Sequence, residues 1–379
     1  MLLRVLVLAV AAALVGAALS TPGRTAIATL LLLPHFFPGE VTRPLGRLTQ
    51  PPVVTTLTVA GPGAMVADVY RPAHAGKHPA IVLLLGVNPL PRNHEQVTSL
   101  AAGLARSGLV TAVAESEALV SGEIGPEEID NLVALFQQLE QDPAVDPTRI
   151  GFAGFCVGAA LELLAASDPR IADRVAWINA FSVYADATAV IRAILSQTMP
   201  TPAGPLSWTP HETTRVVFTR HLVSGLLDLR ERQLLLREFL DSIPLSVEER
   251  EALSPAGTRT WELLRATEPA EIDRLLAGLP EETRAQLRDL SPAVSAHRIR
   301  AKTFIMHDER DTLLPVSGAR ELVAAFPADA TPTYTEFRLF EHVVPGGTDD
   351  PIAFTGQLIS LFRHIHGVLS TAYGGRPGS

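Results

Sequence analysis

The sequence predicts an α/β fold in which a mostly parallel sheet is covered by helices on both faces. Short apolar runs, such as residues 80–85 and 110–114, alternate with longer stretches of helical periodicity. Runs that are apolar throughout are typical of strands buried on both faces, and their alternation with helices indicates parallel pairing. In addition, a strand pattern at 149–155 leads directly into a helical pattern at 157–167, in which the small residues Ala159 and Ala160 let the helix close on the strand.

The elements follow one another in a regular order. A hairpin comes first, because the β-rich runs 53–60 and 64–70 flank the turn Gly-Pro-Gly. Further strands are expected at 80–85, 110–114, 149–155, 175–180, 302–306 and 334–340. Helices are expected at 94–106, 126–141, 157–167, 317–326 and 351–369.

The alternation stops near Ala185 and resumes near residue 290. Between them the pattern is helical with proline breaks, and Ser246 with Glu249 predicts a capping box. We expect a helical lid inserted into the core. The predicted domains are an N-terminal segment (1–38), a linker (39–52), the first part of the core (53–185), the lid insertion (186–290) and the second part of the core (291–379).

Two apolar stretches open the chain. Residues 5–23 carry no charge, and residues 25–37 are again apolar. The first stretch is close to the ~20 residues that a membrane-spanning helix needs, whereas the second is too short to span alone. We interpret the pair as a hydrophobic anchor, with a cleaved signal or a buried core helix as the alternatives. The protein is therefore expected to be membrane-anchored or secreted, with the membrane as a partner.

Composition excludes several classes of protein. The chain has 379 residues, of which 31 are basic and 40 acidic, giving a net charge of −9 without a basic cluster. This balance argues against nucleic acid as a partner. A single cysteine allows neither an intramolecular disulfide nor a cysteine-based zinc site. We expect no cofactor and no metal.

The strongest chemical motif is Gly-Phe-Cys-Val-Gly at residues 154–158, between a predicted strand and a predicted helix. This is the setting of a nucleophile elbow, in which glycines flank a strained turn and the central side chain projects from the edge of the sheet. We therefore assign Cys156 as the nucleophile. A thiol at a helix N-terminus is biased towards the reactive thiolate. The alternative is that Cys156 is merely a small buried apolar residue.

A nucleophile of this kind needs a base and an acid that orients the base. In this type of fold the chain order is nucleophile, acid, histidine. Asp311 follows the strand at 302–306, and His342 follows the strand at 334–340, so both lie at carboxyl ends of strands, where α/β sites assemble. We assign Asp311 as the acid and His342 as the base. Asp308 and Glu309 remain rivals for the acid, and His307 for the base.

An oxyanion hole should complete the site. The backbone N–H of Val157, directly after the nucleophile, is the expected first donor. The second donor is expected in the loop after the strand at 80–85, and Val87 is the residue we assign.

Together these residues resemble the dienelactone hydrolase family of the α/β-hydrolase superfamily. The resemblance rests on the motif around Cys156, its lead-in from residue 145, the Asp-x-x-x-Pro pattern at 311–315, and His342. It implies an α/β-hydrolase fold and a Cys-His-Asp triad that opens enol-lactones. Leu85 and Asp308 differ from the residues that are usual in the family.

The residues and the resemblance together predict a carboxylic ester hydrolase without a cofactor. Its substrate would be a small molecule with a lactone, enol ester, aryl ester or thioester group, cleaved through a thioester acyl-enzyme. A cysteine peptidase or an acyltransferase would use the same triad. The alternative from another class is a membrane-anchored binding protein of the same fold with a degenerate site.

Overall fold

An eight-stranded sheet forms the centre of the molecule, with strand order β1-β2-β4-β3-β5-β6-β9-β10. The computed structural model describes residue 16 and residues 20–37, 42–87, 91–341, 344–345 and 351–374. The strands are β1 (Val53–Thr58), β2 (Met65–Arg71), β3 (His78–Leu84), β4 (Val110–Ser116), β5 (Val145–Phe155), β6 (Trp177–Phe181), β9 (Lys302–Asp308) and β10 (Thr333–Phe337). β1, β2 and β4 pair antiparallel at one edge, and the other pairs are parallel. The predicted hairpin and mostly parallel sheet are confirmed.

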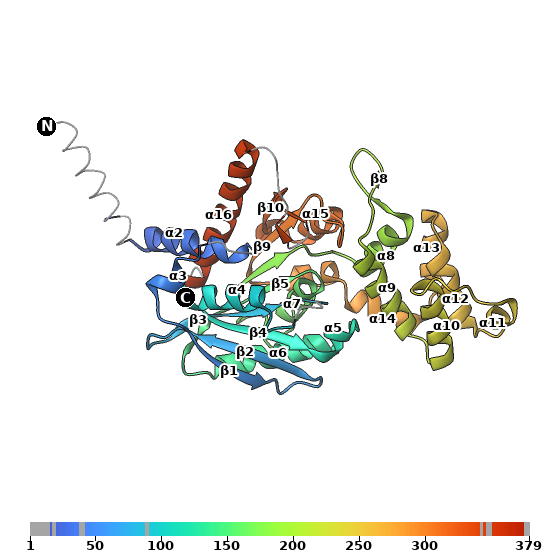
Figure 1. Ribbon diagram of the computed structural model, residues 1–379, viewed down its shortest axis with the longest axis horizontal. Coiled ribbons are helices and arrows are strands. Elements are labelled where there is room, and N and C mark those ends of the chain that lie inside the picture. The colour runs from blue at the N-terminus through green and yellow to red at the C-terminus, as the bar shows by residue number, and fades with distance from the viewer. Residues whose placement is uncertain are drawn as a thin grey trace.

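Helices cover both faces of the sheet, as the continuous apolar strands require (Figure 1). Within β3, Val82 and Leu84 pack into one core cluster, and Ile81 and Leu83 into the other. The first cluster includes residues of α6 (Glu127–Glu140), α7 (Val157–Ala166) and α15 (Val316–Ala325). The second includes residues of α4 (Glu95–Arg106) and α16 (Pro351–Gly374). Side chains of a strand alternate between faces, so a strand buried on both sides has to be apolar throughout.

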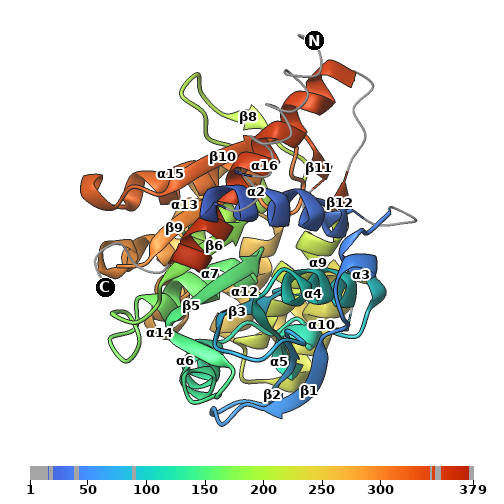
Figure 2. The same ribbon diagram turned by 90° about the vertical axis from the view of Figure 1, so that its left-hand side faces the viewer.

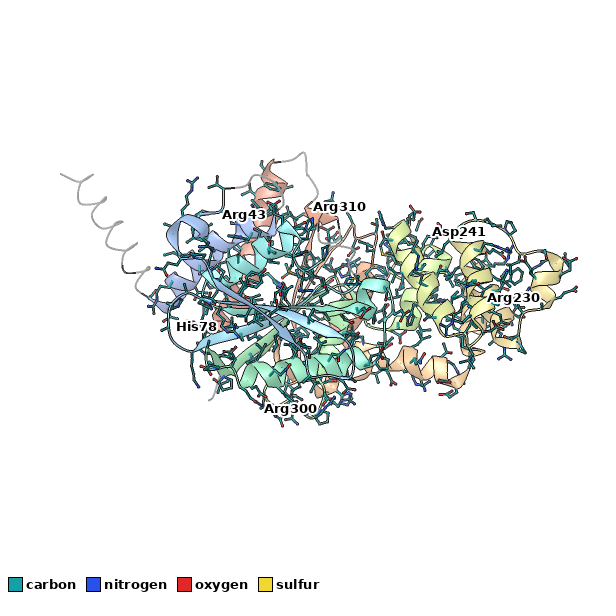
Figure 3. All side chains as sticks on the ribbon, turned by 60° about the horizontal axis from the view of Figure 1, so that its bottom comes forward. Arg43, His78, Arg230, Asp241, Arg300 and Arg310 are labelled. Carbon is teal, nitrogen blue, oxygen red and sulfur yellow. The ribbon has the colours of Figure 1, made fainter. Side chains whose placement is uncertain are left out.

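A helical region lies between β6 and β9, and we call it the insertion (Figure 1; Arg230 and Asp241 mark it in Figure 3). Its helices are α8 (Ala187–Ser196), α9 (Glu212–Ser224), α10 (Leu229–Phe239), α11 (Val247–Glu251), α12 (Pro255–Arg265), α13 (Pro269–Ala277) and α14 (Glu281–Asp289), with a small hairpin of β7 (Thr198–Met199) and β8 (Leu206–Ser207). The predicted capping box of Ser246 and Glu249 opens α11. The insertion packs around two apolar clusters, one that includes Leu263 and also Val316 of α15, and one that includes Leu235. That it acts as a lid stays a prediction.

The second apolar stretch of the N-terminus is part of the folded body. α2 (Thr21–Leu32) and the short 3₁₀ helix η1 (Leu33–Phe36) contact α16 and α4, and Figure 2 shows α2 crossing α16. Leu32 is fully buried, and His35 hydrogen-bonds the carbonyl of Ser99 at 2.8 Å. The sequence predicts an anchor over the whole segment 1–38. Residues 21–36 differ from this prediction, because they pack on the body. The first apolar run of the segment lies mostly outside the described residues. In the part of the chain that is described, no helix is long and apolar enough to cross a membrane.

The predicted linker at 39–52 is also partly folded. Of this range, residues 42–52 are described, and they include the one-turn helix α3 (Leu45–Leu48), in which Leu45 is buried. The guanidinium of Arg106 donates to the carbonyls of Thr49 and Gln50 at 2.6 and 3.1 Å. These bonds hold the segment against α4, because they give two of its backbone carbonyl groups partners within the protein.

Candidate active site

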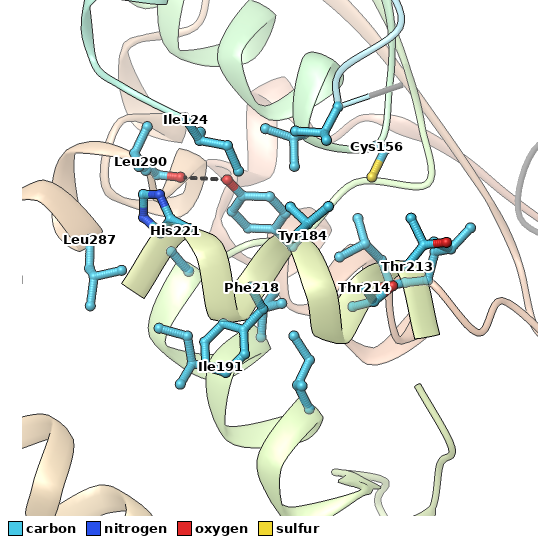
Figure 4. Close-up of a pocket in the computed structure, with 18 residues that line it drawn as sticks. Ile124, Cys156, Tyr184, Ile191, Thr213, Thr214, Phe218, His221, Leu287 and Leu290 are labelled. Carbon is cyan, nitrogen blue, oxygen red and sulfur yellow. Dashed lines mark hydrogen bonds between the residues drawn. The ribbon is translucent and has the colours of Figure 1, made fainter. Parts of the chain in front are cut away.

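Cys156 stands at a sharp turn between β5 and α7. Its backbone has φ 56° and ψ −129°, and it is the N-cap residue of α7. Positive φ is uncommon for a residue with a side chain and marks a strained position. The N–H of Cys156 donates to the carbonyl of Phe181 in the next strand at 2.9 Å. The half-buried thiol consequently lies at the carboxyl edge of the sheet and lines a pocket (Figure 4).

Two glycines allow the loop after β3 to lie directly against this turn. A Cβ at Gly158 would be 2.5 Å from the carbonyl oxygen of Leu84. A Cβ at Gly86, which has φ 75°, would be 2.7 Å from the nitrogen of Gly158 and 3.3 Å from that of Val157. The first N–H groups of a helix have no intrahelical acceptor. The Val157 amide is the first of α7, and these distances place it beside the loop that carries Val87. Both residues line the pocket.

Asp311 lies in the turn after β9 and is almost completely buried. Its Oδ1 accepts hydrogen bonds from the N–H groups of Leu313 at 2.7 Å and Leu314 at 3.0 Å. Its Oδ2 accepts from the hydroxyl of Ser182, which follows β6. Leu313 and Leu314 line the same pocket as Cys156. The structure thus brings the turn that carries the assigned acid to the wall of the pocket that holds the assigned nucleophile.

The rival acids have other partners. Asp308 is fully buried, and its carboxylate accepts from the N–H of Arg310 at 2.8 Å and of Phe340 at 2.6 Å. Burial raises the pKa of Asp308, although these two backbone hydrogen bonds and the Arg310 guanidinium act in the opposite direction. Glu309 pairs with Arg338 at 2.9 Å. Asp308 therefore fixes the chain after β10, and the choice of Asp311 as the acid stays a prediction.

The rival base His307 is enclosed in the sheet. It has no exposed surface, and its Nε2 lies 3.1 Å from the carbonyl oxygen of Leu314 and 3.4 Å from Oδ2 of Asp311. Among the described residues, the histidine that lines the pocket of Cys156 is His221, not His307. His307 is placed to support the acid turn, since it contacts both of its ends.

His342, the assigned base, lies outside the described residues. The described chain on either side forms a small antiparallel pair, β11 (Phe340–Glu341) with β12 (Val344–Pro345). The tie between Asp308 and Phe340 fixes the start of this pair. The assignment of His342 stays a prediction from the sequence.

The pocket is formed jointly by the core and the insertion, and its volume is about 730 Å³ including the open mouth. Its walls are mostly apolar. The hydroxyl of Tyr184 is engaged by the carbonyl of Leu290 at 3.1 Å, so the ring presents carbon to the pocket (Figure 4). The lining residues are Val87, Ile124, Cys156, Val157, Tyr184, Ala187, Val190, Ile191, Ile194, Thr213, Thr214, Val217, Phe218, His221, Leu287, Leu290, Leu313 and Leu314. An apolar pocket beside a thiol suits a ligand with an apolar group.

Sequence reasoning missed two buried polar groups near the site. His221 in α9 lines the pocket, its Nδ1 is buried without a hydrogen-bond partner in the described structure, and burial lowers its pKa. Glu162 in α7 is completely buried, and desolvation raises the pKa of its carboxyl well above the usual value. The spacing of Thr213, Val217 and His221 by four residues was a usable signal for the first. Nothing in the sequence marks the second.

Three solved structures are similar to this chain at low sequence identity. A puromycin-hydrolyzing peptidase of Mycobacterium tuberculosis is 14% identical over 90% of this chain, which spans 42% of that protein, with a TM-score of 0.51. The 2,6-dihydroxy-pseudo-oxynicotine hydrolase is 16% identical over 86% of this chain and 69% of its own, with a TM-score of 0.46. The esterase domain of a Rhodothermus marinus protein is 12% identical over 83% of this chain and 99% of its own, with a TM-score of 0.43.

No family model and no curated protein matches the sequence. The fold that emerges, from the strand order and from the likeness to the peptidase, is the α/β-hydrolase fold. Its site has a cysteine at the strand-to-helix turn after β5. A fold of this kind hosts many chemistries, so the activity has to be argued from the site.

Proposed function

We propose that this protein is a hydrolase of ester-type bonds that uses Cys156 as its nucleophile. The observation that carries the proposal is the strained turn that points the thiol into an apolar pocket. The substrate would be a small lactone, enol or aryl ester, or thioester with an apolar group. The resemblance of residues 154–158 to dienelactone hydrolases supports the choice of sulfur chemistry.

The reaction would proceed in two steps. The thiolate of Cys156 attacks the carbonyl carbon, and the amides of Val157 and Val87 stabilise the oxyanion. The C–O or C–S bond to the leaving group breaks, and His342 supplies the proton while Asp311 orients its ring. Water then gives a proton to His342 and attacks the thioester, which releases the acid and restores the thiolate.

The sulfur nucleophile limits the substrates. From the tetrahedral intermediate a thiolate leaves more readily than an alkoxide, so an alkyl ester returns to starting material. An enol ester, aryl ester or thioester has a leaving group that competes with the thiolate. We therefore expect turnover of phenyl acetate and phenyl thioacetate and little turnover of ethyl acetate. Equal rates on phenyl and ethyl acetate would contradict the role given to sulfur.

A membrane or secreted location is part of the proposal. It is supported by the uncharged run at residues 5–23. Because residues 21–36 pack on the body, this part of the proposal rests on the run that precedes them.

The decisive experiment measures the reactivity of Cys156 in the full chain. We expect iodoacetamide to alkylate it at mildly acidic pH faster than free cysteine, and a substrate to leave an acyl group on it that a mass spectrum detects. Both should be lost in His342→Ala, and the acyl adduct in Cys156→Ala. A thiol as slow as free cysteine in both the wild type and His342→Ala, with ligand bound but not turned over, would favour the non-catalytic binding protein.

A further inference from the structure

We infer that Ile124, His221 and Leu287 form an end wall that sets how long an apolar group the pocket accepts. The inference rests on the proposed function and refines it, because it defines the substrate by length. It follows from the direction of the pocket, from a second pocket behind the same three side chains, and from the state of His221.

The pocket runs along one face of α9. Thr213, Val217 and His221 are spaced by four residues, as are Thr214 and Phe218, so all five share a face. From Thr213 to His221 a helix rises by about 12 Å. In Figure 4, Cys156 and Thr213 lie towards one end of the pocket, and His221 and Leu287 towards the other. A substrate held at the thiol would extend its apolar group along α9 towards His221.

A second pocket begins where the first one ends. Ile124, His221 and Leu287 line both of them. The second pocket has a volume of about 750 Å³ with its open mouth, and its other lining residues are mostly polar, including Glu123, Glu127, Thr283 and Gln286. The three shared side chains thus separate an apolar space from a polar one. A chain that outgrew the first pocket would meet this wall.

His221 is suited to a wall that an apolar chain approaches. Burial lowers its pKa, so the ring is neutral near pH 7 and puts no charge at the end of the pocket. Its buried Nδ1 has no hydrogen-bond partner in the described structure. Truncation of this side chain therefore breaks no hydrogen bond at that nitrogen, and it opens the first pocket towards the second.

The test is a chain-length series on the full protein. Phenyl thioesters of acetic, butyric, octanoic and dodecanoic acid vary the acyl side, and the acetate esters of para-alkylphenols vary the other side. Each series is measured with the wild type, His221→Ala, Leu287→Ala and Leu245→Ala. Leu245 is buried in another apolar cluster of the insertion and does not line the pocket, so its variant is the control for loss of packing.

Only the series whose varied group extends towards His221 should respond to the wall. For that series, we expect kcat/KM in the wild type to fall beyond a certain chain length. His221→Ala and Leu287→Ala should improve the ratio of the longest to the shorter substrates by about tenfold or more, whereas Leu245→Ala should leave it unchanged. Leu287→Phe should shift the optimum to shorter chains, and it keeps the test usable if a truncated variant does not fold.

Unchanged ratios in active His221→Ala and Leu287→Phe proteins would overturn the inference while the proposed function stands. If the wild type turns over no substrate, displacement of a fluorescent apolar probe by alcohols of increasing length tests the wall independently of catalysis. The same dependence on length in the wild type and both alanine variants would then overturn it.

Discussion

Two residues with positive φ follow adjacent strands and position the proposed nucleophile and the proposed acid. Cys156 after β5 and Ser182 after β6 both have φ 56°. Each donates its N–H to the next strand along the sheet, Cys156 to Phe181 at 2.9 Å and Ser182 to Met306 at 2.8 Å. Strained backbone persists only where its surroundings hold it in place. One turn points the thiol into the pocket, and the other brings a hydroxyl to Asp311.

Gly86 is expected to tolerate no side chain. In Gly86→Ala, the new Cβ would lie 2.7 Å from the nitrogen of Gly158 and 2.9 Å from the carbonyl oxygen of Phe155. The loop would have to move away from Val157, so the two proposed oxyanion donors would separate. We expect kcat on phenyl thioacetate to fall by about 100-fold or more, which is the effect of losing one such donor.

Gly108→Ala is the matched control for Gly86→Ala. Gly108 also has positive φ, at 106°, but a Cβ there would meet nothing within 4 Å. The control variant carries the same kind of backbone strain without the clash. A similar loss of kcat in both variants would mean that strain alone, and not the position of the loop, lowers the rate.

Glu162 is expected to make the protein less stable as pH rises. Its pKa is raised by burial in the folded state, whereas the unfolded carboxyl ionises near its usual value of 4.5. Above that value the unfolded state loses a proton that the folded state keeps, so folding loses up to about 1.4 kcal/mol per pH unit until the folded pKa is reached. Glu162→Gln removes this dependence.

The measurement compares slopes and not absolute stabilities. Urea unfolding between about pH 5.5 and pH 7.5 should show a flatter dependence of the unfolding free energy on pH for Glu162→Gln than for the wild type. Glu117→Gln, at an exposed position, is the control and should keep the wild-type slope. Parallel curves for the wild type and Glu162→Gln would show that Glu162 is ionised in the folded protein.

At the scale of elements, the insertion is tied to the turn that carries Asp311, the proposed acid. Trp208 Nε1 donates to the carbonyl of Asp311 at 2.8 Å. The N–H of His211 and the hydroxyl of Thr214 donate to the next two carbonyls, at 2.7 and 3.0 Å. Consecutive backbone acceptors bound by one segment fix its position relative to the turn. The start of α9 is therefore a fixed wall of the pocket.

Trp208 is accordingly expected to act as a positioning residue for Asp311. Trp208→Phe keeps the buried ring but removes the hydrogen bond, which is worth about 1 kcal/mol. We expect a fall of about fivefold in kcat, with KM nearly unchanged, because the lost hydrogen bond holds the carbonyl of Asp311 while the side chains that line the pocket are all kept. The rate of alkylation of Cys156 should fall in parallel, since it depends on the same proposed triad.

Trp261→Phe provides the comparison for Trp208→Phe. Trp261 also lies in the insertion and loses an equivalent hydrogen bond, from Nε1 to Glu238 at 3.0 Å, remote from Asp311. It should retain the wild-type kcat and alkylation rate. If Trp261→Phe loses as much activity as Trp208→Phe, the effect is one of general stability.

At the scale of the whole molecule, the sequence predicted what depends on local patterns. Continuous apolar runs predicted the buried parallel strands, and the short motif around Cys156 predicted the turn. The pocket could not be predicted from the sequence, because its walls come from the core and from residues such as Phe218 and Leu287 that only folding brings together. The hydrogen bond from Trp208 to Asp311 spans 103 positions, and no local pattern reports it.

The N-terminus shows the same limit most clearly. An apolar segment that inserts into a membrane and one that packs on a protein have the same composition, so the pattern at residues 25–37 could not distinguish them. What decides is the surface that receives it. α2 lies against α16, from the other end of the chain, and Leu32 joins a cluster with Leu361 and Ile365.

Two leucines of α2 test this packing. Leu32 is fully buried, whereas Leu30 is 62% exposed. In the full chain, Leu32→Ala should lower the free energy of unfolding by about 2 to 5 kcal/mol, the cost of a cavity in a core, and Leu30→Ala by no more than about 0.5 kcal/mol. Denaturant unfolding in a mild detergent measures both. Equal effects would mean that α2 is not part of the folded body. They would then favour the interpretation of α2 as part of an anchor, which its composition first suggested.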